Sequence, residues 1–367
     1  MNEYRITKNP LESTMNDLKL FEQTQYCIDF LKNEFPEKND DEIKYHSEVA
    51  SACFRQARQY YSVGNASSLE TSPLLYSYAF NNILKGTCYL KSFDDGILKG
   101  FEDHGFTFKN QNIGSTILES RVNTKQHGAL ISLLNLFDCT LTAQSIDLNK
   151  ILRHIPGLGD VYYKTTGRIS FIASQEKNDK TTYSIYGDRI YDEERYIFKA
   201  FGMMATSIYN YNMISCSINI EGKKNIKENK FNKSNIYYKN FLILPDKYNE
   251  GIKDLNVSFY CYILIMAYGM LVRYNAHLWD NFIDKKISKE STLIDLSIKN
   301  AVDNFYYQIH NILFQYYYID DSYNDIDVKK VISDSTEEII ENINANIRRH
   351  NYQYNSNMIC PWKKNHI

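Results

Sequence analysis

The sequence predicts an α+β protein in which N-terminal and C-terminal helical portions pack together, with a central antiparallel β-rich region between them along the chain. Apolar residues recur every three to four positions near both ends, whereas the middle is rich in β-branched and aromatic segments. We therefore expect a helical N-terminal region with a loop and short-strand segment (1–155), a β-rich middle region (156–250) and a helical C-terminal region (251–367).

Two entry signals mark the helices of the first region. Asn39 followed three residues later by Glu42 resembles a capping box, and Ser72 before Pro73 resembles an N-cap with proline at the first helical position. The second of these helices is expected to end near Leu90. Within the first, apolar residues lie four apart, at Val49, Cys53, Ala57 and Tyr61.

The β-rich character begins after residue 156. Strands are expected at residues 161–163, 168–173, 181–186, 214–220 and 236–244, with one helix around residues 193–209. Before them, glycines punctuate residues 96–128, which predicts loops and short strands. The lysine-rich residues 221–234 are expected to form a polar loop.

Helical spacing returns toward the C-terminus. Apolar residues three or four apart run from Ile294 to Ile312, and Ser335 with Glu338 resembles another capping box. The most apolar run, residues 259–272, has 14 residues, whereas a membrane span needs roughly 20. We expect that run to be a buried helix, and the protein to be soluble and to have no membrane partner.

Composition argues against several classes of function. Lys and Arg number 42 and Asp and Glu 44, so the net charge of −2 does not favour nucleic acid as a partner, although a local basic patch is still allowed. Seven cysteines without a C-x-x-C pair indicate reduced thiols in the cytoplasm rather than disulfides or a thiolate zinc site. The chain has no P-loop, nucleophile elbow or zinc-binding H-E-x-x-H motif. We expect no cofactor and no metal.

Three short segments, taken together, resemble one known family. They are FRQARQYY at residues 54–61, PLLYSYAFNN at residues 73–82 and LVRYN at residues 271–275, with His104-Gly105 between the second and third. In that order they resemble the YaaC-like family of bacterial proteins. The resemblance implies a cytosolic bacterial protein whose relatives are sometimes encoded beside antiphage-defence genes, and it brings no agreed catalytic residues.

Arg121 and His127 have an R-x5-H spacing, which resembles the motif of HEPN ribonucleases. In those enzymes an arginine and a histidine from helix ends meet and cleave RNA without metal. Imidazole exchanges a proton near neutral pH, and guanidinium stabilises charge that develops on phosphate. Val122 directly after the arginine and Gly128 after the histidine depart from the motif, so an exposed loop is the alternative interpretation.

Other basic residues are candidate ligands for an anion. Arg273 and Asn275 follow the apolar run, where the guanidinium can hold a phosphate or carboxylate or can cap the helix end. Arg55 and Arg58 share a helix face and can bind an anion or lock two helices together. We expect Arg55 and Arg273 to share one seam between the helical portions. His104, on a glycine-flanked turn, is a further candidate ligand, with loop geometry as its alternative.

The chain contains 31 tyrosines, in clusters that include residues 306–307 and 316–318. Acidic residues follow the second cluster, at Asp320, Asp321, Asp325 and Asp327, and this arrangement favours a protein partner over a phosphate backbone. The leading hypothesis is a cytoplasmic sensing or scaffolding subunit of an antiphage-defence-type system that acts through a protein partner. A metal-independent endoribonuclease and a nucleotide- or anion-binding sensor are the alternatives, and the oligomeric state is left open.

Overall fold

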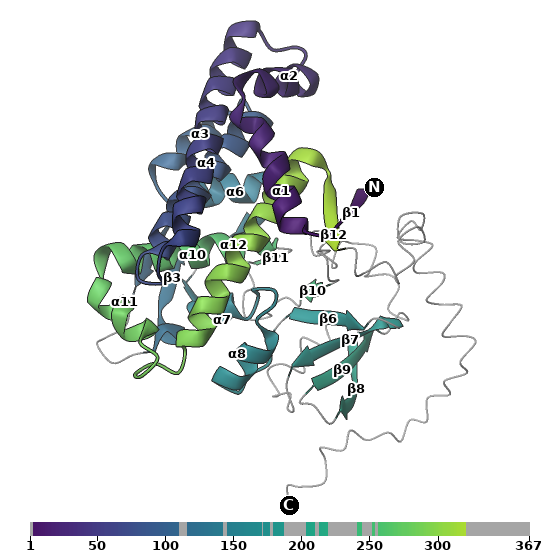
Figure 1. Cartoon of the computed structure of the whole chain (residues 1–367), viewed down its shortest axis with the longest axis vertical. Helices are drawn as coiled ribbons and strands as arrows, with labels where there is room; N and C mark the ends of the chain where they lie inside the picture. The colour runs from purple at the N-terminus through teal and green to yellow at the C-terminus, as the bar shows by residue number, and fades with distance from the viewer. Residues whose placement is uncertain are drawn as a thin grey trace, which may run out of the picture. The chain divides into compact units, whose positions relative to one another are not determined.

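The computed structural model describes residues 3–109, 116–141, 145–170, 172–176, 179–186, 203–209, 213–218, 241–243, 252–253 and 256–320 (Figure 1). All of them belong to one compact unit, residues 1–326, and residues 327–367 form a second unit outside the described residues. The α+β prediction is confirmed, because helices from both ends of the unit pack together and the middle carries antiparallel strands. The expected loop at residues 221–234 and the helix expected from Ser335 lie outside the described residues, and the three-region division stays a prediction.

Helices α3 (Asp40–Ala66) and α4 (Ser72–Lys91) form an antiparallel pair joined by a short turn (Figure 1). The predicted capping box opens α3, since Asn39 Oδ1 accepts from the Glu42 backbone N–H at 2.8 Å and Asn39 Nδ2 donates to the Glu42 carboxylate at 2.7 Å. Gly86 allows the close approach, because a Cβ there would lie 2.9 Å from the Phe54 ring.

The start of α4 differs from the prediction by one residue. Thr71 is the N-cap and Ser72 is the first helical residue, and the Thr71 side chain makes no capping hydrogen bond. Ser72 is buried instead of facing the helix end. The sequence alone does not show that the helix begins at Ser72 rather than after it.

The patterns above do not predict the helices that precede α3. These are α1 (Pro10–Leu18), the 3-10 turn η1 (Lys19–Glu22) and α2 (Thr24–Glu34). The start of α1 does carry a signal, because the Asn9 side chain accepts from the Glu12 backbone N–H at 3.2 Å and Pro10 occupies the first helical position. Helix α1 has only nine residues, so its apolar face is too short for the helical period to be recognised in the sequence.

Helix α10 (Val257–Tyr274) lies in the core, where it packs against α4 and α12 (Ser291–Phe314) and leads into α11 (Ala276–Ile283). Among the described residues it is the one helix long and apolar enough to cross a membrane, but 78% of it is buried inside the protein. That burial fits the core helix of a soluble protein and confirms the predicted buried helix. Gly269 permits the packing, because a Cβ there would lie 2.8 Å from Ser77 Cβ of α4.

Helices α4 and α12 meet through an aromatic pair. The rings of Phe80 and Phe305 stack with centroids 4.0 Å apart and planes 15° from parallel. Both side chains are fully buried. This contact joins a helix of the N-terminal portion directly to one of the C-terminal portion.

Residues 95–170 form short elements, as the glycine pattern predicts for most of that stretch. The helical turns are α5 (Asp95–Leu98), η2 (Lys99–Glu102), η3 (Ile117–Glu119), α6 (Ala129–Leu136), α7 (Leu148–Leu152) and α8 (Gly159–Thr166). Strands β2 (Phe106–Lys109), β3 (Arg121–Thr124) and β5 (Ser145–Asp147) form an antiparallel sheet in the order β2-β3-β5. A separate antiparallel pair joins β4 (Thr140–Leu141) to β11 (Ile252–Lys253).

A five-stranded antiparallel sheet has the order β10-β6-β7-β9-β8. Its strands are β6 (Ile172–Glu176), β7 (Asp179–Tyr186), β8 (Met203–Tyr209), β9 (Met213–Ile218) and β10 (Phe241–Ile243). At the centre of the sheet β7 pairs with β9, and Thr182 lies opposite Ser217 and Tyr186 opposite Met213. These strands agree with four of the five expected segments, with shifted ends.

Two predictions for this region are wrong. Residues 161–163 belong to α8 rather than to a strand, because three residues are too few to distinguish the two periods and Gly167, with φ +69°, ends a helix. The helix expected around residues 193–209 is contradicted over residues 203–209, which form β8. Residues 193–202 lie outside the described residues.

The two ends of the helical bundle are joined by one carboxylate. Strand β1 (Glu3–Thr7) pairs in parallel with β12 (Tyr316–Asp320). Beside them, Asp17 Oδ2 accepts hydrogen bonds from Tyr316 OH at 2.5 Å, Tyr318 OH at 2.8 Å and His310 Nε2 at 2.9 Å. Burial raises the pKa of Asp17, but these three hydrogen bonds more than offset that effect and lower it. We call these four residues the Asp17 clasp.

The clasp changes the interpretation of the tyrosine clusters. Tyr316 is buried and both Tyr316 and Tyr318 bond an internal carboxylate, so these side chains are not free to anchor a partner. Tyr306 and Tyr307 are buried in α12 as well. Composition could not reveal this, because tyrosine suits a buried position with a hydrogen bond as well as an interface.

Phe80→Ala should lower the free energy of unfolding by about 3–5 kcal/mol, because it removes one ring of a buried stack and leaves a cavity. Val63→Ala is the control, since Val63 is 54% exposed on α3, and it should change stability by less than about 0.5 kcal/mol. Urea denaturation followed by circular dichroism measures both, and equal effects would contradict the packing described.

Asp17→Asn should lower the free energy of unfolding by about 2 kcal/mol at neutral pH, because hydrogen bonds to a charged acceptor are lost. The lowered pKa means that wild-type Asp17 stabilises the fold above its unfolded pKa near 3.8 and loses that contribution as pH falls through its lower folded pKa. The difference between variant and wild type should therefore shrink only below about pH 4. Denaturation at several pH values tests this. A difference independent of pH would be inconsistent with an ionised acceptor.

Candidate functional site

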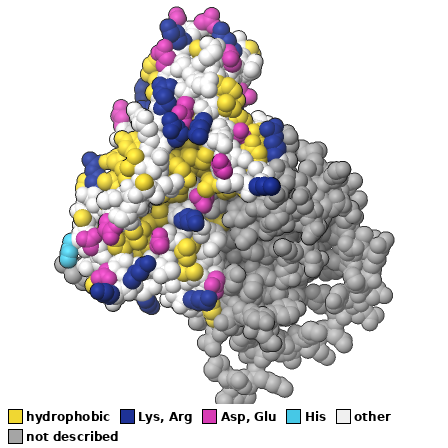
Figure 2. All heavy atoms as spheres, in the orientation of Figure 1, with side chains coloured by type: hydrophobic (Ala, Val, Ile, Leu, Met, Phe, Trp, Pro, Cys, Tyr) yellow, Lys and Arg dark blue, Asp and Glu magenta, His cyan; other side chains and the backbone are white. Residues whose placement is uncertain are grey.

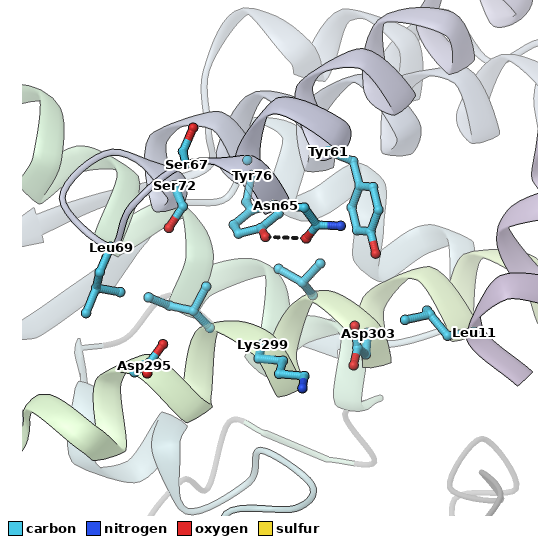
Figure 3. A pocket seen from close by; sticks show the side chains of 13 residues that line it. Leu11, Tyr61, Asn65, Ser67, Leu69, Ser72, Tyr76, Asp295, Lys299 and Asp303 are labelled. Atoms are coloured by element: carbon cyan, nitrogen blue, oxygen red, sulfur yellow. Dashed lines mark hydrogen bonds between the residues drawn. The ribbon is translucent and has the colours of Figure 1, made fainter. Parts of the chain in front are cut away.

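A cavity of about 360 Å³ opens to solvent where the turn between α3 and α4 faces α12 and α1 (Figure 3). Pockets that bind small molecules have volumes of roughly 300–1,000 Å³. Figure 2 shows hydrophobic side chains gathered over the region where these helices meet, with charged side chains around it. The cavity therefore has the size and the mixed lining of a binding site for a small molecule.

Helix α12 supplies the charged wall of the cavity. Asp295, Lys299 and Asp303 follow at intervals of four residues, which places them on one helix face, and all three line the cavity (Figure 3). Ile298 and Val302 beside them are buried and form its apolar floor. Two carboxylates and one ammonium group give this wall a net charge of −1 when all three are ionised.

Tyrosines from α3 and α4 form the opposite wall. Tyr76 OH donates to Asn65 Oδ1 at 2.6 Å (Figure 3), and the Tyr61 ring lies 6.1 Å from the Tyr76 ring and 5.0 Å from that of Tyr306. Gly64 makes room for this wall, because a Cβ there would lie 2.9 Å from the Tyr76 ring. The wall thus offers aromatic surface together with hydroxyl and amide groups.

Asp303 is a half-buried carboxylate without a partner among the described residues. Within the described residues it makes no hydrogen bond or ion pair, although Lys299 lies one helical turn away. Burial raises the pKa of Asp303 to about 6, and the charge of Lys299 offsets only part of that shift. A carboxyl group that titrates near neutral pH inside a cleft is typical of a functional site.

A second polar cluster joins the segments that carry the family resemblance. Tyr262 of α10 is fully buried and its hydroxyl donates to Asn81 Oδ1 of α4 at 2.8 Å. The Asn81 Nδ2 atom lies 3.3 Å from His104 Nδ1, so His104 accepts and carries its proton on Nε2. This chain of contacts ties α4 and α10 to the turn before β2.

His104 is surrounded by charge. Lys125 Nζ donates to Asp103 Oδ2 at 2.6 Å beside it. Burial lowers the pKa of His104, Asp103 opposes that shift, and Arg273 and Lys125 add to it. The candidate ligands His104 and Arg273 therefore lie within electrostatic range of each other, as a basic cluster distinct from the cavity.

The other candidate anion ligands do not join that cluster. Arg55 donates to the Glu22 backbone carbonyl at 2.6 Å, and Arg58 Nε forms a 2.5 Å ion pair with the Glu22 carboxylate. Both therefore bind η1, which is the locking role that the sequence left open. Arg55 contacts Glu22 and Arg273 contacts Tyr274, so within the described residues no shared contact joins the two arginines, and the seam between them stays a prediction.

Arg273 and Asn275 lie at the end of α10. Arg273 is exposed in the last turn, with its guanidinium 5.2 Å from the Tyr274 ring centroid, and Asn275 caps α10 through its backbone N–H, which donates to the Leu271 carbonyl at 2.8 Å. The placement suits the helix-capping alternative. Asn275 is exposed, and its side chain makes no capping bond to α11.

Arg121 and His127 lie on a strand and a turn rather than at helix ends. Arg121 opens β3 and its Nε forms a 2.6 Å ion pair with Asp147 of β5. His127 is exposed and precedes Gly128, whose φ of +102° is incompatible with a helix interior. The helical setting of the HEPN motif is therefore missing at this spacing.

Neither thiols nor metal ligands gather in the described part of the chain. It contains no group of three or more His, Cys, Asp or Glu side chains that can hold a metal ion. Five cysteines are free and buried, namely Cys27, Cys53, Cys88, Cys139 and Cys261, and burial raises the pKa of Cys27 to about 12. Such thiols are poor nucleophiles.

Sequence reasoning missed the cavity. One signal for it exists, because Asp295, Lys299 and Asp303 interrupt the apolar pattern of α12 at a regular spacing of four residues. Such a stripe usually faces solvent, and only the position of the α3–α4 turn makes it a wall. The sequence pattern carries no information about contacts between helices that are distant in the chain, and these contacts create the cavity.

Asp303→Asn should raise the free energy of unfolding by about 2 kcal/mol near pH 7.5, because ionising a carboxyl whose pKa is raised to about 6 costs stability in the folded state. The folded wild type holds this proton more tightly than the unfolded chain, so its stability falls as pH rises from about 4 to about 6. The increase in the free energy of unfolding caused by Asp303→Asn should therefore grow as the pH rises from about 4 to about 6. Urea denaturation of the variant and of Asp280→Asn, on the exposed face of α11, measures it, and a destabilised Asp303→Asn would refute the assignment.

Comparison with known proteins supports one assignment. The family model described as YaaC-like protein matches residues 19–313, which contain the cavity walls of α3, α4 and α12 and the His104 cluster. Searches of curated proteins and of solved structures both return no match. Because the family model spans most of the sequence, the chain belongs to the YaaC-like protein family.

Proposed function

We propose that this chain is a cytoplasmic ligand-sensing protein that acts through a protein partner, with the cavity between the α3–α4 turn, α12 and α1 as its sensor site. The observation that carries the proposal is a solvent-open cavity of about 360 Å³ that holds the unpaired carboxylate of Asp303 opposite two tyrosines. A pocket of this size in which a few polar groups converge beside a titratable group with a shifted pKa is typical of a binding site.

The lining favours binding over catalysis. It contains carboxylates, an ammonium group, hydroxyls and an amide, but no histidine or cysteine. The Ser67 hydroxyl donates to the Val63 carbonyl at 2.7 Å, so it has no base to activate it as a nucleophile. The cavity can therefore recognise a ligand by charge and shape without a chemical step.

Two elements connect the cavity to the end of the described chain. Leu11 of α1 and the Asp303 face of α12 line the cavity, and the same two helices carry Asp17 and His310 of the Asp17 clasp. A ligand that changes the spacing of α1 and α12 changes the geometry of the clasp, and with it β1 and β12. This coupling supports a sensing role.

The partner and the biological setting are proposed on other grounds. Members of the YaaC-like family are sometimes encoded beside antiphage-defence genes, which supports a sensing or scaffolding subunit of such a system. Two exposed apolar side chains, Tyr274 at 68% and Ile287 at 70%, are candidate partner contacts in place of the tyrosines that the Asp17 clasp uses.

The two alternatives have less support. An endoribonuclease at Arg121 and His127 would need the arginine to leave its ion pair with Asp147. An anion sensor would have to use His104, Lys125 and Arg273, because Arg55 and Arg58 bind Glu22.

A metabolite extract of the native host, fractionated and tested by thermal shift, should contain a fraction that stabilises the protein, because a ligand bound only by the folded state raises the melting temperature. Ser67→Trp should abolish that shift by filling the cavity, whereas Ser68→Trp, at the neighbouring exposed position outside the lining, should keep it. Equal shifts in both variants would place the binding elsewhere, and no shift from any fraction would contradict the sensor proposal.

The partner half of the proposal has its own measurement. Affinity purification of the tagged protein from the host, with and without the stabilising fraction, should recover a partner whose amount changes at least about threefold with the fraction. Recovery that is equal under both conditions would contradict ligand-dependent signalling. Recovery of no partner would contradict the proposed mode of action.

A further inference from the structure

The charge of the cavity is unbalanced. Asp295 and Asp303 face a single cation, Lys299, and the tyrosines and Asn65 on the opposite wall carry no charge near neutral pH (Figure 3). Burial raises the pKa of Tyr61, and it raises the pKa of Tyr76 to about 12, so both hydroxyls stay protonated. The lining of the cavity therefore carries one net negative charge when all three groups are ionised, and a charge partly enclosed by protein interacts more strongly than it does in water.

Asp303 has no internal counter-ion. An ion pair requires nitrogen and oxygen within 4.0 Å, and the structure shows none between Lys299 and Asp303 although they lie on the same helix face. A partly desolvated carboxylate without a partner is unfavourable, and a cation that enters beside it relieves that penalty. The groups that face Asp303 are Lys299 on its own helix, Tyr61 of α3 and Tyr76 of α4, with apolar Leu11 from α1.

The aromatic wall suits the same kind of ligand. The rings of Tyr61 and Tyr76 both line the cavity and lie 6.1 Å apart at 55°, and aromatic rings attract cations through their π-electron density. Tyr76 donates its proton to Asn65, so its oxygen can still accept a hydrogen bond from an N–H donor. A carboxylate together with aromatic rings is the usual composition of sites that hold amines and quaternary ammonium groups.

A phosphate-bearing ligand fits poorly. Lys299 is the one cation in the lining, and Asp295 and Asp303 on either side of it would repel the anion. Phosphate sites use arginines, lysines or a helix N-terminus directed at the ligand. The arginines Arg55 and Arg58 of α3 are absent from this lining and bind Glu22 instead.

We infer that the ligand of this cavity is an organic cation, an amine or guanidinium compound of small-metabolite size, whose charged group binds Asp303 and whose apolar part lies against Tyr61 and Tyr76. This inference rests on the proposed sensing function and names the class of ligand that the site takes. It also assigns Asp303 as the residue that selects for positive charge.

Isothermal titration calorimetry with tyramine, agmatine and choline tests this inference, with 4-ethylphenol as the neutral analogue of tyramine and adenosine monophosphate as the anionic probe. At least one cation should bind at least about tenfold more tightly than both other probes. Ser67→Trp should abolish its binding. Asp303→Asn should weaken it at least about tenfold, whereas Asp280→Asn, which removes a carboxylate from α11 outside the cavity, should leave it within about twofold.

Two further measurements should change the affinity for cations in a direction that a purely structural role of Asp303 does not predict. Lys299→Gln should strengthen cation binding about threefold or more, because it removes the competing charge. Lowering the pH from about 7.5 to about 5 should weaken cation binding about tenfold in the wild type and not in Asp303→Asn, because a carboxyl with a pKa of about 6 is mostly protonated at the lower pH. Binding that is equal at both pH values would contradict a role for the Asp303 charge.

The outcomes separate this inference from the proposed function. If 4-ethylphenol or adenosine monophosphate binds as tightly as the cations, or if Asp303→Asn binds cations normally, the cation inference is wrong while a sensor cavity blocked by Ser67→Trp remains. If no cation binds, the inference is overturned. If neither these probes nor any extract fraction gives a signal that Ser67→Trp abolishes, the proposed function fails with it.

Discussion

The architecture depends on how closely α4 approaches three other helices at once. It touches α3 where Gly86 meets Phe54, α10 where Ser77 meets Gly269, and α12 through the stack of Phe80 on Phe305. Because van der Waals contact falls off steeply with separation, the absence of a side chain at both glycines sets the helix spacing. The distance between the tyrosine wall and the acidic face of α12 follows from that spacing, so core packing also determines the dimensions of the cavity.

Helix α12 contributes residues both to the cavity and to the Asp17 clasp. Asp295, Lys299 and Asp303, in its first half and at its middle, line the cavity, and its last turns carry His310, which bonds Asp17. A helix transmits displacement along its axis with little internal deformation, because its backbone hydrogen bonds join every turn to the next. The cavity at one end and the attachment of β1 and β12 at the other are thus mechanically connected through a single element.

Local patterns predicted the elements whose signals lie within one segment. The capping box at Asn39, the apolar repeat of α12 and the burial of α10 all follow from neighbouring residues. The errors have long-range causes. Residues 203–209 adopt a strand because they pair with β9, and Tyr316 and Tyr318 bond a carboxylate that lies 299 and 301 residues away in the chain, respectively. The sequence named His104 and Arg273 as candidate ligands, which lie in a cluster separate from the cavity, and their role stays a prediction. It did not reveal the cavity, which exists only where α3, α4 and α12 meet.

The Asp17 clasp straddles the limits of the region that defines the family. The match covers residues 19–313, so it contains His310 but stops short of Asp17 at one end and of both clasp tyrosines at the other. A fragment trimmed to those limits would keep an imidazole enclosed in apolar surroundings and take away its only bonded carboxylate among the described residues. Domain limits drawn from family profiles can therefore cut through a hydrogen-bonded unit, and recombinant versions of this protein are best begun ahead of β1 and continued past β12.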